Sequence, residues 1–111
     1  MGKFEIYQSE KNQEFYFRLK AGNGENILGS QGYNNKASCE NGVASVVKNS
    51  GDESKYELKE AKNGKFHFSL KAGNGQIIGS SQMYKTESGM KNGIQSVMKN
   101  AADAKVEDLT S

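Results

Sequence analysis

The sequence has few residues with which to build a covalent or metal-bound framework. Cysteine occurs once, at Cys39, so no disulfide can form within the chain and a zinc site made of thiolates is not expected. Histidine also occurs once, at His67. A single unpaired cysteine fits a reducing compartment, and we expect a cytoplasmic protein with no metal and no other cofactor.

Long apolar runs and blocks of like charge are also missing. No stretch reaches the roughly 18 apolar residues that a membrane-spanning helix needs, and the opening MGKFEIY lacks the apolar core of a signal peptide. Lys and Arg number 15 against 13 Asp and Glu, which leaves a net charge of +2 without a basic run. We expect a soluble protein that does not bind membranes.

An internal repeat is the strongest feature that is present. Residues 15–49 match residues 66–100 at a constant offset of 51, and about half of the aligned positions are identical. The match continues upstream when the first turn of the first copy is allowed one extra residue. The sequence therefore predicts a single domain, 1–111, made of two repeats at about 1–52 and 53–111.

Each repeat begins with apolar residues at every second position, the period of a strand with one buried face. The pattern comprises Phe4, Ile6, Phe15, Phe17 and Leu19 in the first copy, and Tyr56, Leu58, Phe66, Phe68 and Leu70 in the second. A third short strand is expected at Ile27 or Leu28, and at Ile77 or Ile78. Short turns separate these runs, so each repeat is predicted to start as a three-stranded antiparallel meander.

A helical period follows in both repeats. The apolar stripe is Cys39, Val43, Val46 and Val47 in the first copy, and Met90, Ile94, Val97, Met98 and Ala101 in the second. Asn35 and Thr86 are the predicted N-caps. After the second helix, residues 104–111 contain two apolar positions and are predicted to form a further strand.

Both predicted helices contain glycine at the same place, Gly42 and Gly93. Glycine inside a helix costs about 1 kcal/mol relative to alanine. Because the same cost appears twice, we infer that each helix backbone packs closely against the sheet at this position.

The phrase LKAGNG occurs twice, at 19–24 and 70–75, and could be a phosphate-binding loop or a turn. A phosphate loop places its glycines directly before a helix, whose N–H groups then point at the anion. Here a short apolar strand follows the glycines, and the predicted helix begins more than ten residues later. We therefore predict two hairpin turns, in which Gly and Asn adopt the positive φ angles of a tight connection.

These patterns together define the fold class. One unit of about fifty residues buries too little surface to be stable alone, so the two repeats are expected to pack together about a pseudo-twofold axis. The prediction is an α+β fold of two tandem β-β-β-α(-β) repeats, forming one antiparallel sheet with two helices packed on one face. An internal pseudo-dimer of this kind is expected to be a monomer.

The phrases KFEIY, FYFRLKAGNGE and NGVASVVKN, each with a counterpart in the second half, resemble the YegP-like family of small bacterial proteins of uncharacterised function. The resemblance covers nearly the whole chain. It implies the same doubled sheet, with C-terminal strands exchanged between the units. It implies no catalytic residues, and the family's pattern offers none to transfer.

The two reactive side chains both have structural explanations. His67 lies between two core residues, so its side chain points away from the core, and no acidic or nucleophilic partner is evident. Cys39 aligns with Met90 on the apolar stripe, which indicates a small buried hydrophobe. We therefore expect no catalytic site, and an enzyme of unknown type ranks third among the functions considered.

The remaining candidates lie on the sheet face opposite the helices, which we call the open face. Tyr16, Arg18 and Lys20 alternate with core residues and share this face; His67 and Lys71 are their counterparts in the second repeat. The favoured hypothesis is a non-catalytic binding or interaction module that uses the open face or the groove between the repeats. The alternative is binding of RNA or single-stranded nucleic acid, because aromatic residues interleaved with cations suit base stacking and phosphate contact.

Overall fold

The computed structural model describes residues 2–110 and shows the same order of elements twice. The first repeat contains β1 (Lys3–Gln8), β2 (Phe15–Lys20), β3 (Asn26–Gly29) and α1 (Lys36–Asn49). The second contains a 3₁₀ helix, η1 (Glu53–Lys55), followed by β4 (Tyr56–Glu60), β5 (Phe66–Lys71), β6 (Ile77–Ser80), α2 (Glu87–Ala101) and β7 (Lys105–Asp108). The predicted α+β order is confirmed, including the final strand.

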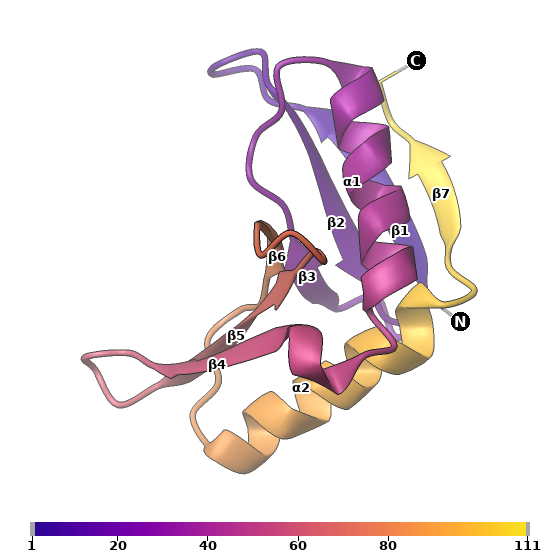
Figure 1. Cartoon of the computed structure of the whole chain (residues 1–111). Helices are drawn as coiled ribbons and strands as arrows, with labels where there is room; N and C mark the ends of the chain where they lie inside the picture. Colours follow the sequence, from indigo (N-terminus) through magenta and orange to yellow (C-terminus); the bar gives the residue numbers. More distant parts are fainter. Residues whose placement is uncertain (1, 111) are drawn as a thin grey trace.

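All the strands form one sheet in the order β4-β5-β6-β3-β2-β1-β7. The two meanders meet at its centre, where Gly29 of β3 pairs with Ser80 of β6. Both helices pack on the same face of the sheet (Figure 1), as predicted. The strand order places the predicted pseudo-twofold axis between β3 and β6.

One pair of neighbouring strands is not antiparallel: β7 runs parallel to β1. This strand follows α2 and joins the edge of the other repeat, so the implied exchange of C-terminal strands is present once (Figure 1). The first repeat has no equivalent strand, because residues 50–55 lead from α1 directly into β4. As a result, β4 is an edge strand with no neighbour on its outer side among the described residues.

Both helices begin at the predicted caps. The Asn35 side chain accepts a hydrogen bond from the backbone N–H of Ser38 at 2.8 Å, and the Thr86 side chain accepts one from Gly89 at 2.9 Å. The apolar stripe of α2 is buried or packed against the core, as predicted. In α1 the prediction is wrong for Val47, which is 41% exposed, because it lies one position beyond the buried Val46 and turns away from the sheet.

The two repeats build one core together, which is mainly aliphatic and contains four buried aromatic residues, Phe4, Phe17, Tyr56 and Phe68. Phe17 and Phe68 occupy equivalent positions and are fully buried. Each stacks on a tyrosine from the segment before the helix: Tyr33 and Tyr84 lie 6.3 Å from these rings, centroid to centroid. The tyrosine of each pair also lies next to the helix glycine, Gly42 or Gly93, so we expect the pair to set the distance between each helix and its strands.

The two LKAGNG phrases are the hairpin turns that join β2 to β3 and β5 to β6. Within these two turns, positive φ occurs at Gly24 and Gly75, at +88° and +85°. Asn23 does not adopt the positive φ that was predicted for it; its side chain accepts a hydrogen bond from the Glu25 N–H at 3.0 Å. The Gly24 N–H donates to the Ala21 carbonyl inside the turn, so this amide is already satisfied.

Candidate functional site

The open face holds the predicted residues in two separate patches. Tyr16, Arg18 and Lys20 lie together on β2, whereas His67 and Lys71 lie on β5. Strands β3 and β6 separate the two groups in the sheet. The structure therefore brings together the first three residues but does not join them to the last two.

The first patch is organised around a buried carboxylate on β1 that the sequence interpretation missed. Glu5 is opposite Arg18 in the β1–β2 ladder and is only 5% exposed. Its carboxylate accepts a hydrogen bond from Arg18 Nε at 2.7 Å and has Lys3 Nζ at 3.3 Å and Lys20 Nζ at 3.4 Å. One carboxylate thus holds three cations in place.

These contacts change the acidity of Glu5. The hydrogen bond from Arg18, assisted by Lys3 and Lys20, lowers the pKa of the Glu5 carboxyl to about 2, although burial opposes the shift. Glu5 is consequently ionised throughout the neutral range. The carboxylate and its three cations form a fixed group of charges beside the neighbouring aromatic rings.

Two tyrosines complete this patch. Tyr7 and Tyr16 are cross-strand partners whose rings stack with 5.7 Å between centroids and 16° between planes. The Arg18 guanidinium carbon lies 4.5 Å from the centre of the Tyr7 ring. Glu5 and Tyr7 could have been found from sequence, because they alternate with the buried Phe4 and Ile6.

The second patch keeps the central carboxylate and lysine contacts but has neither the arginine nor the tyrosines of the first. Glu57 is the counterpart of Glu5, and its carboxylate contacts Lys71 Nζ at 2.6 Å and Lys59 Nζ at 2.9 Å. The hydrogen bond from Lys71 lowers the pKa of Glu57 to about 2. Ser69 stands where the first repeat has Arg18, and His67 lies opposite Lys59.

An open hollow of about 340 Å³ lies between the two patches, at the seam of the repeats. Tyr7 and Arg18 line it from the first patch, and Ser80, Ser81 and Gln82 line it from the second repeat. The groove between the repeats and the first open-face patch are therefore one continuous surface.

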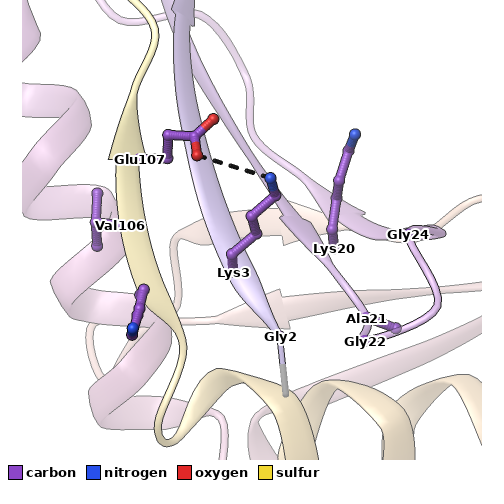
Figure 2. A pocket seen from close by; sticks show the side chains of 9 residues that line it. Gly2, Lys3, Lys20, Ala21, Gly22, Gly24, Val106 and Glu107 are labelled. Atoms are coloured by element: carbon purple, nitrogen blue, oxygen red, sulfur yellow. Dashed lines mark ion pairs between the residues drawn. The ribbon is translucent and has the colours of Figure 1, made fainter.

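A larger hollow of about 570 Å³ borders this face beside β7. Lys3, Lys20, Gly22 and Gly24 line one side, and Glu107 lies on the other (Figure 2). Lys105 also lines the hollow. Two of its lysines have acidic partners, because Lys3 contacts Glu107 at 3.7 Å and Lys20 contacts Glu5 at 3.4 Å. We regard this hollow as the margin of the first patch.

The structural interpretation of Cys39 is confirmed. Its side chain is fully buried, and burial raises the pKa of the thiol to about 11, so the thiol stays protonated at neutral pH. Within residues 2–110, no three His, Cys, Asp or Glu side chains gather in the manner of a metal site. Neither of the helices in that range is long and apolar enough to cross a membrane.

Removal of the Glu5 charge tests how strongly the patch depends on it. We expect Glu5→Gln to lower the free energy of unfolding by about 1–3 kcal/mol at pH 7, because three cations lose their shared partner. Since folding lowers the Glu5 pKa from 4.5 to about 2, its contribution is present above pH 4.5 and is lost as pH falls toward 2. Urea titrations of both proteins at several pH values would measure this.

The matched control is Glu57→Gln. The Glu57 side chain is 36% exposed, so Glu57→Gln should lower the free energy of unfolding clearly less than Glu5→Gln does. Equal losses for the two variants, or a Glu5→Gln loss that persists unchanged at pH 2, would contradict the central role of Glu5.

Comparisons with known proteins agree with the repeat and with the fold. A family model described as a domain of unknown function (DUF1508) matches twice, at residues 10–57 and 61–108. The UPF0339 protein YegP of Escherichia coli is 55% identical over 109 residues, which cover 98% of each chain. A UPF0339 protein of Stutzerimonas stutzeri, named for its place in the ptx operon 5′ region, is 52% identical over 97% of this chain and 96% of its own.

Two solution NMR structures share the architecture. The YegP structure from Escherichia coli superimposes with a TM-score of 0.93 at 53% identity, over 99% of this chain and 94% of that one. The structure of a UPF0339 protein from Shewanella oneidensis gives a TM-score of 0.92 at 49% identity, over 98% and 92%. The two family matches, the near full-length identity and the shared fold show that the chain belongs to the UPF0339 family, with two DUF1508 repeats.

Proposed function

We propose that this protein is a non-catalytic interaction module that binds a protein partner through the first patch of the open face. The observation that carries the proposal is the cluster of Tyr7, Tyr16 and Arg18 on the sheet face opposite both helices. Tyrosine and arginine are enriched among the residues that dominate binding energy at protein interfaces. All three side chains are half-buried, so each keeps part of its surface for a partner.

The cluster is ordered before any partner arrives. Glu5 fixes Arg18, Arg18 lies over the Tyr7 ring, and Tyr7 stacks on Tyr16. Side chains that are already held in place lose little conformational entropy on binding, which favours affinity. The hollow beside Tyr7 and Arg18 would receive a protruding side chain of the partner.

Nucleic-acid binding is the second candidate. Five cations on the open face, at positions 3, 18, 20, 59 and 71, contact three carboxylates, Glu5, Glu57 and Glu107, which leaves an excess of positive charge. It ranks second because the Tyr7 ring already contacts Tyr16 and Arg18, and each of the five cations already has an acidic partner. Base stacking and phosphate contact would have to compete with these interactions.

An NMR experiment separates the two candidates. Isotope-labelled protein is mixed with a bacterial lysate that is untreated, protease-treated or nuclease-treated, and backbone amide signals are followed. We expect broadening centred on Tyr7, Tyr16 and Arg18 that protease removes and nuclease leaves unchanged. Loss of the effect with nuclease, together with a steep fall as salt rises, would establish the nucleic-acid alternative instead.

The second repeat supplies the matched control. Tyr16→His with Arg18→Ser converts the first patch into the residues that stand at the equivalent positions, His67 and Ser69. We expect this double variant to remain folded and to lose the broadening. Unchanged broadening in the variant, or no change at these amides in the original protein, would refute the proposal.

A further inference from the structure

Strands β1 and β4 are equivalent by the internal repeat, but their outer edges differ. At one end, β7 covers the outer edge of β1. At the other end, β4 is the last strand, and its outer edge has no partner among residues 2–110. This edge is distinct from the open-face patch, so a role for it is independent of the proposed function.

The backbone of β4 presents the same groups that β1 uses to hold β7. Ile6 is paired with Phe17 across the β1–β2 ladder, and Leu58 is paired with Phe68 at the equivalent place. The Ile6 carbonyl, on the outer side, accepts a hydrogen bond from the Leu109 N–H at 2.8 Å. By the same register, the Leu58 carbonyl points outward and is free to accept a hydrogen bond from an added strand.

A groove runs along this edge, between β4 and α2. It consists of two adjoining hollows of about 370 and 320 Å³ that share Leu58 and Lys91. Leu58 is 46% exposed, whereas its counterpart Ile6 is fully buried. An apolar side chain is thus left uncovered on β4, whereas the equivalent strand β1 has β7 beside it.

The charges beside the groove differ from those at the occupied end. Asp108 of β7 forms an ion pair with Lys36 in the first turn of α1. The equivalent residue of α2 is Glu87, which lines the groove near Leu58 and forms an ion pair with Lys91 of the same helix at 3.2 Å. A second copy of this chain would place its own Asp108 beside Glu87, where the two carboxylates would repel each other and compete for Lys91.

A basic residue is also available on the other side of the edge, at Lys55, the last residue of η1 directly before β4. Glu107 of β7 pairs with Lys3 of β1, and the counterpart of Lys3 in the second repeat is Lys55. An added strand would therefore keep an acidic residue at this position. It would need a basic residue at the next position, where Glu87 replaces Lys36.

We propose that β4 and α2 bind an extended segment of another protein, which adds to the sheet as a strand parallel to β4. The segment carries four residues in succession: apolar, acidic, basic and apolar. Main-chain hydrogen bonds to β4 provide the affinity, as in other cases of strand addition to a free sheet edge. Leu58, Lys55 and Glu87 provide the selectivity, because they face alternate sides of the added strand.

Two synthetic peptides test this proposal. One has the native sequence of β7, Ala104 to Thr110, and the other carries the Asp108→Lys change within it. We expect the changed peptide to shift the amide signals of Tyr56–Glu60 and to bind roughly fivefold more tightly than the native one, because its lysine meets Glu87. In the Glu87→Lys protein the preference should reverse.

Further variants separate strand addition from nonspecific contact. Leu58→Thr should abolish the shifts, whereas Ile77→Thr, which changes a similarly exposed apolar residue on β6, should preserve them. A spin label at the peptide N-terminus should broaden Lys55 more than Glu60 if the added strand is parallel. No shift in β4 at millimolar peptide, the same preference in both proteins, or shifts confined to β1 would each overturn the proposal.

Discussion

Exchanging Leu28 and Gly79 is expected to restore most of the stability that either single substitution removes. These residues occupy equivalent positions in β3 and β6, at the seam between the repeats. Leu28 is almost fully buried, and a Cβ atom placed on Gly79 would lie 2.8 Å from both Leu28 Cγ and Cδ2. The space at the seam therefore accommodates one leucine and not two.

The single changes should both be severe. Gly79→Leu adds a side chain where Leu28 already packs, which we expect to cost about 3 kcal/mol or more. Leu28→Gly leaves a cavity, and loss of a buried leucine typically costs about 2–5 kcal/mol. Because the double variant places one leucine back in the same space, its free energy of unfolding should exceed that of either single variant by more than about 1 kcal/mol.

Urea denaturation of the four proteins would measure these differences. Gly29→Ala is the control, since nothing lies within 4 Å of a Cβ atom placed at that residue, and it should be nearly neutral. Additive losses in the double variant would show that Leu28 and Gly79 do not share one space.

Local periodicity was sufficient to predict most of the fold. The alternation of Phe15, Phe17 and Leu19, and its copy in the second repeat, predicted strands whose buried face is the one observed. Asn35 and Thr86 predicted the helix starts because a cap depends only on the next three residues. Such signals are contained within one element and need no knowledge of its neighbours.

Features that depend on distant neighbours were less accessible. Ile6 and Leu58 have the same place in the alternating pattern, yet one is buried and the other is half-exposed. The difference arises because β7 covers β1 while the short 50–55 connection leaves no strand to cover β4 among the described residues. Nothing in the local sequence of β4 distinguishes these two environments.

The candidate site shows the same division. Tyr16, Arg18 and Lys20 were identified by extending the strand period to the open face, and the same rule applied to β1 would have identified Glu5 and Tyr7. The separation of His67 and Lys71 from this group could not be predicted, because it depends on β3 and β6 meeting at the centre of the sheet.

Alanine at Gly93 is expected to destabilise the protein, against the ordinary preference of helices for alanine. A Cβ atom on Gly93 would meet the Tyr84 hydroxyl and lie 2.6 Å from Tyr84 Cζ. At the equivalent Gly42, it would lie 2.5 Å from the Tyr33 hydroxyl and 2.9 Å from Phe17 Cε2. The close packing inferred from the repeated glycine is therefore present, with the tyrosine ring as the nearest neighbour.

The two effects oppose each other, and their sizes decide the sign. Helix propensity would stabilise alanine by about 1 kcal/mol, whereas forcing an extra carbon into a packed core costs about 1–3 kcal/mol, occasionally more. Tyr84 stacks on the fully buried Phe68 and cannot move away freely, so we expect the steric cost to prevail. Gly93→Ala should lower Tm by several degrees in a thermal melt.

Two comparisons identify the cause. Ala44→Gly, at an exposed position of α1, measures the propensity difference alone and should cost about 1 kcal/mol. Tyr84→Phe removes the hydroxyl that the new Cβ meets, so Gly93→Ala should be less harmful in that background than in the original protein. A rise in Tm for Gly93→Ala would mean that the Tyr84 ring moves aside and that helix propensity alone determines the effect. The tyrosines would then not set the distance between the helices and the sheet.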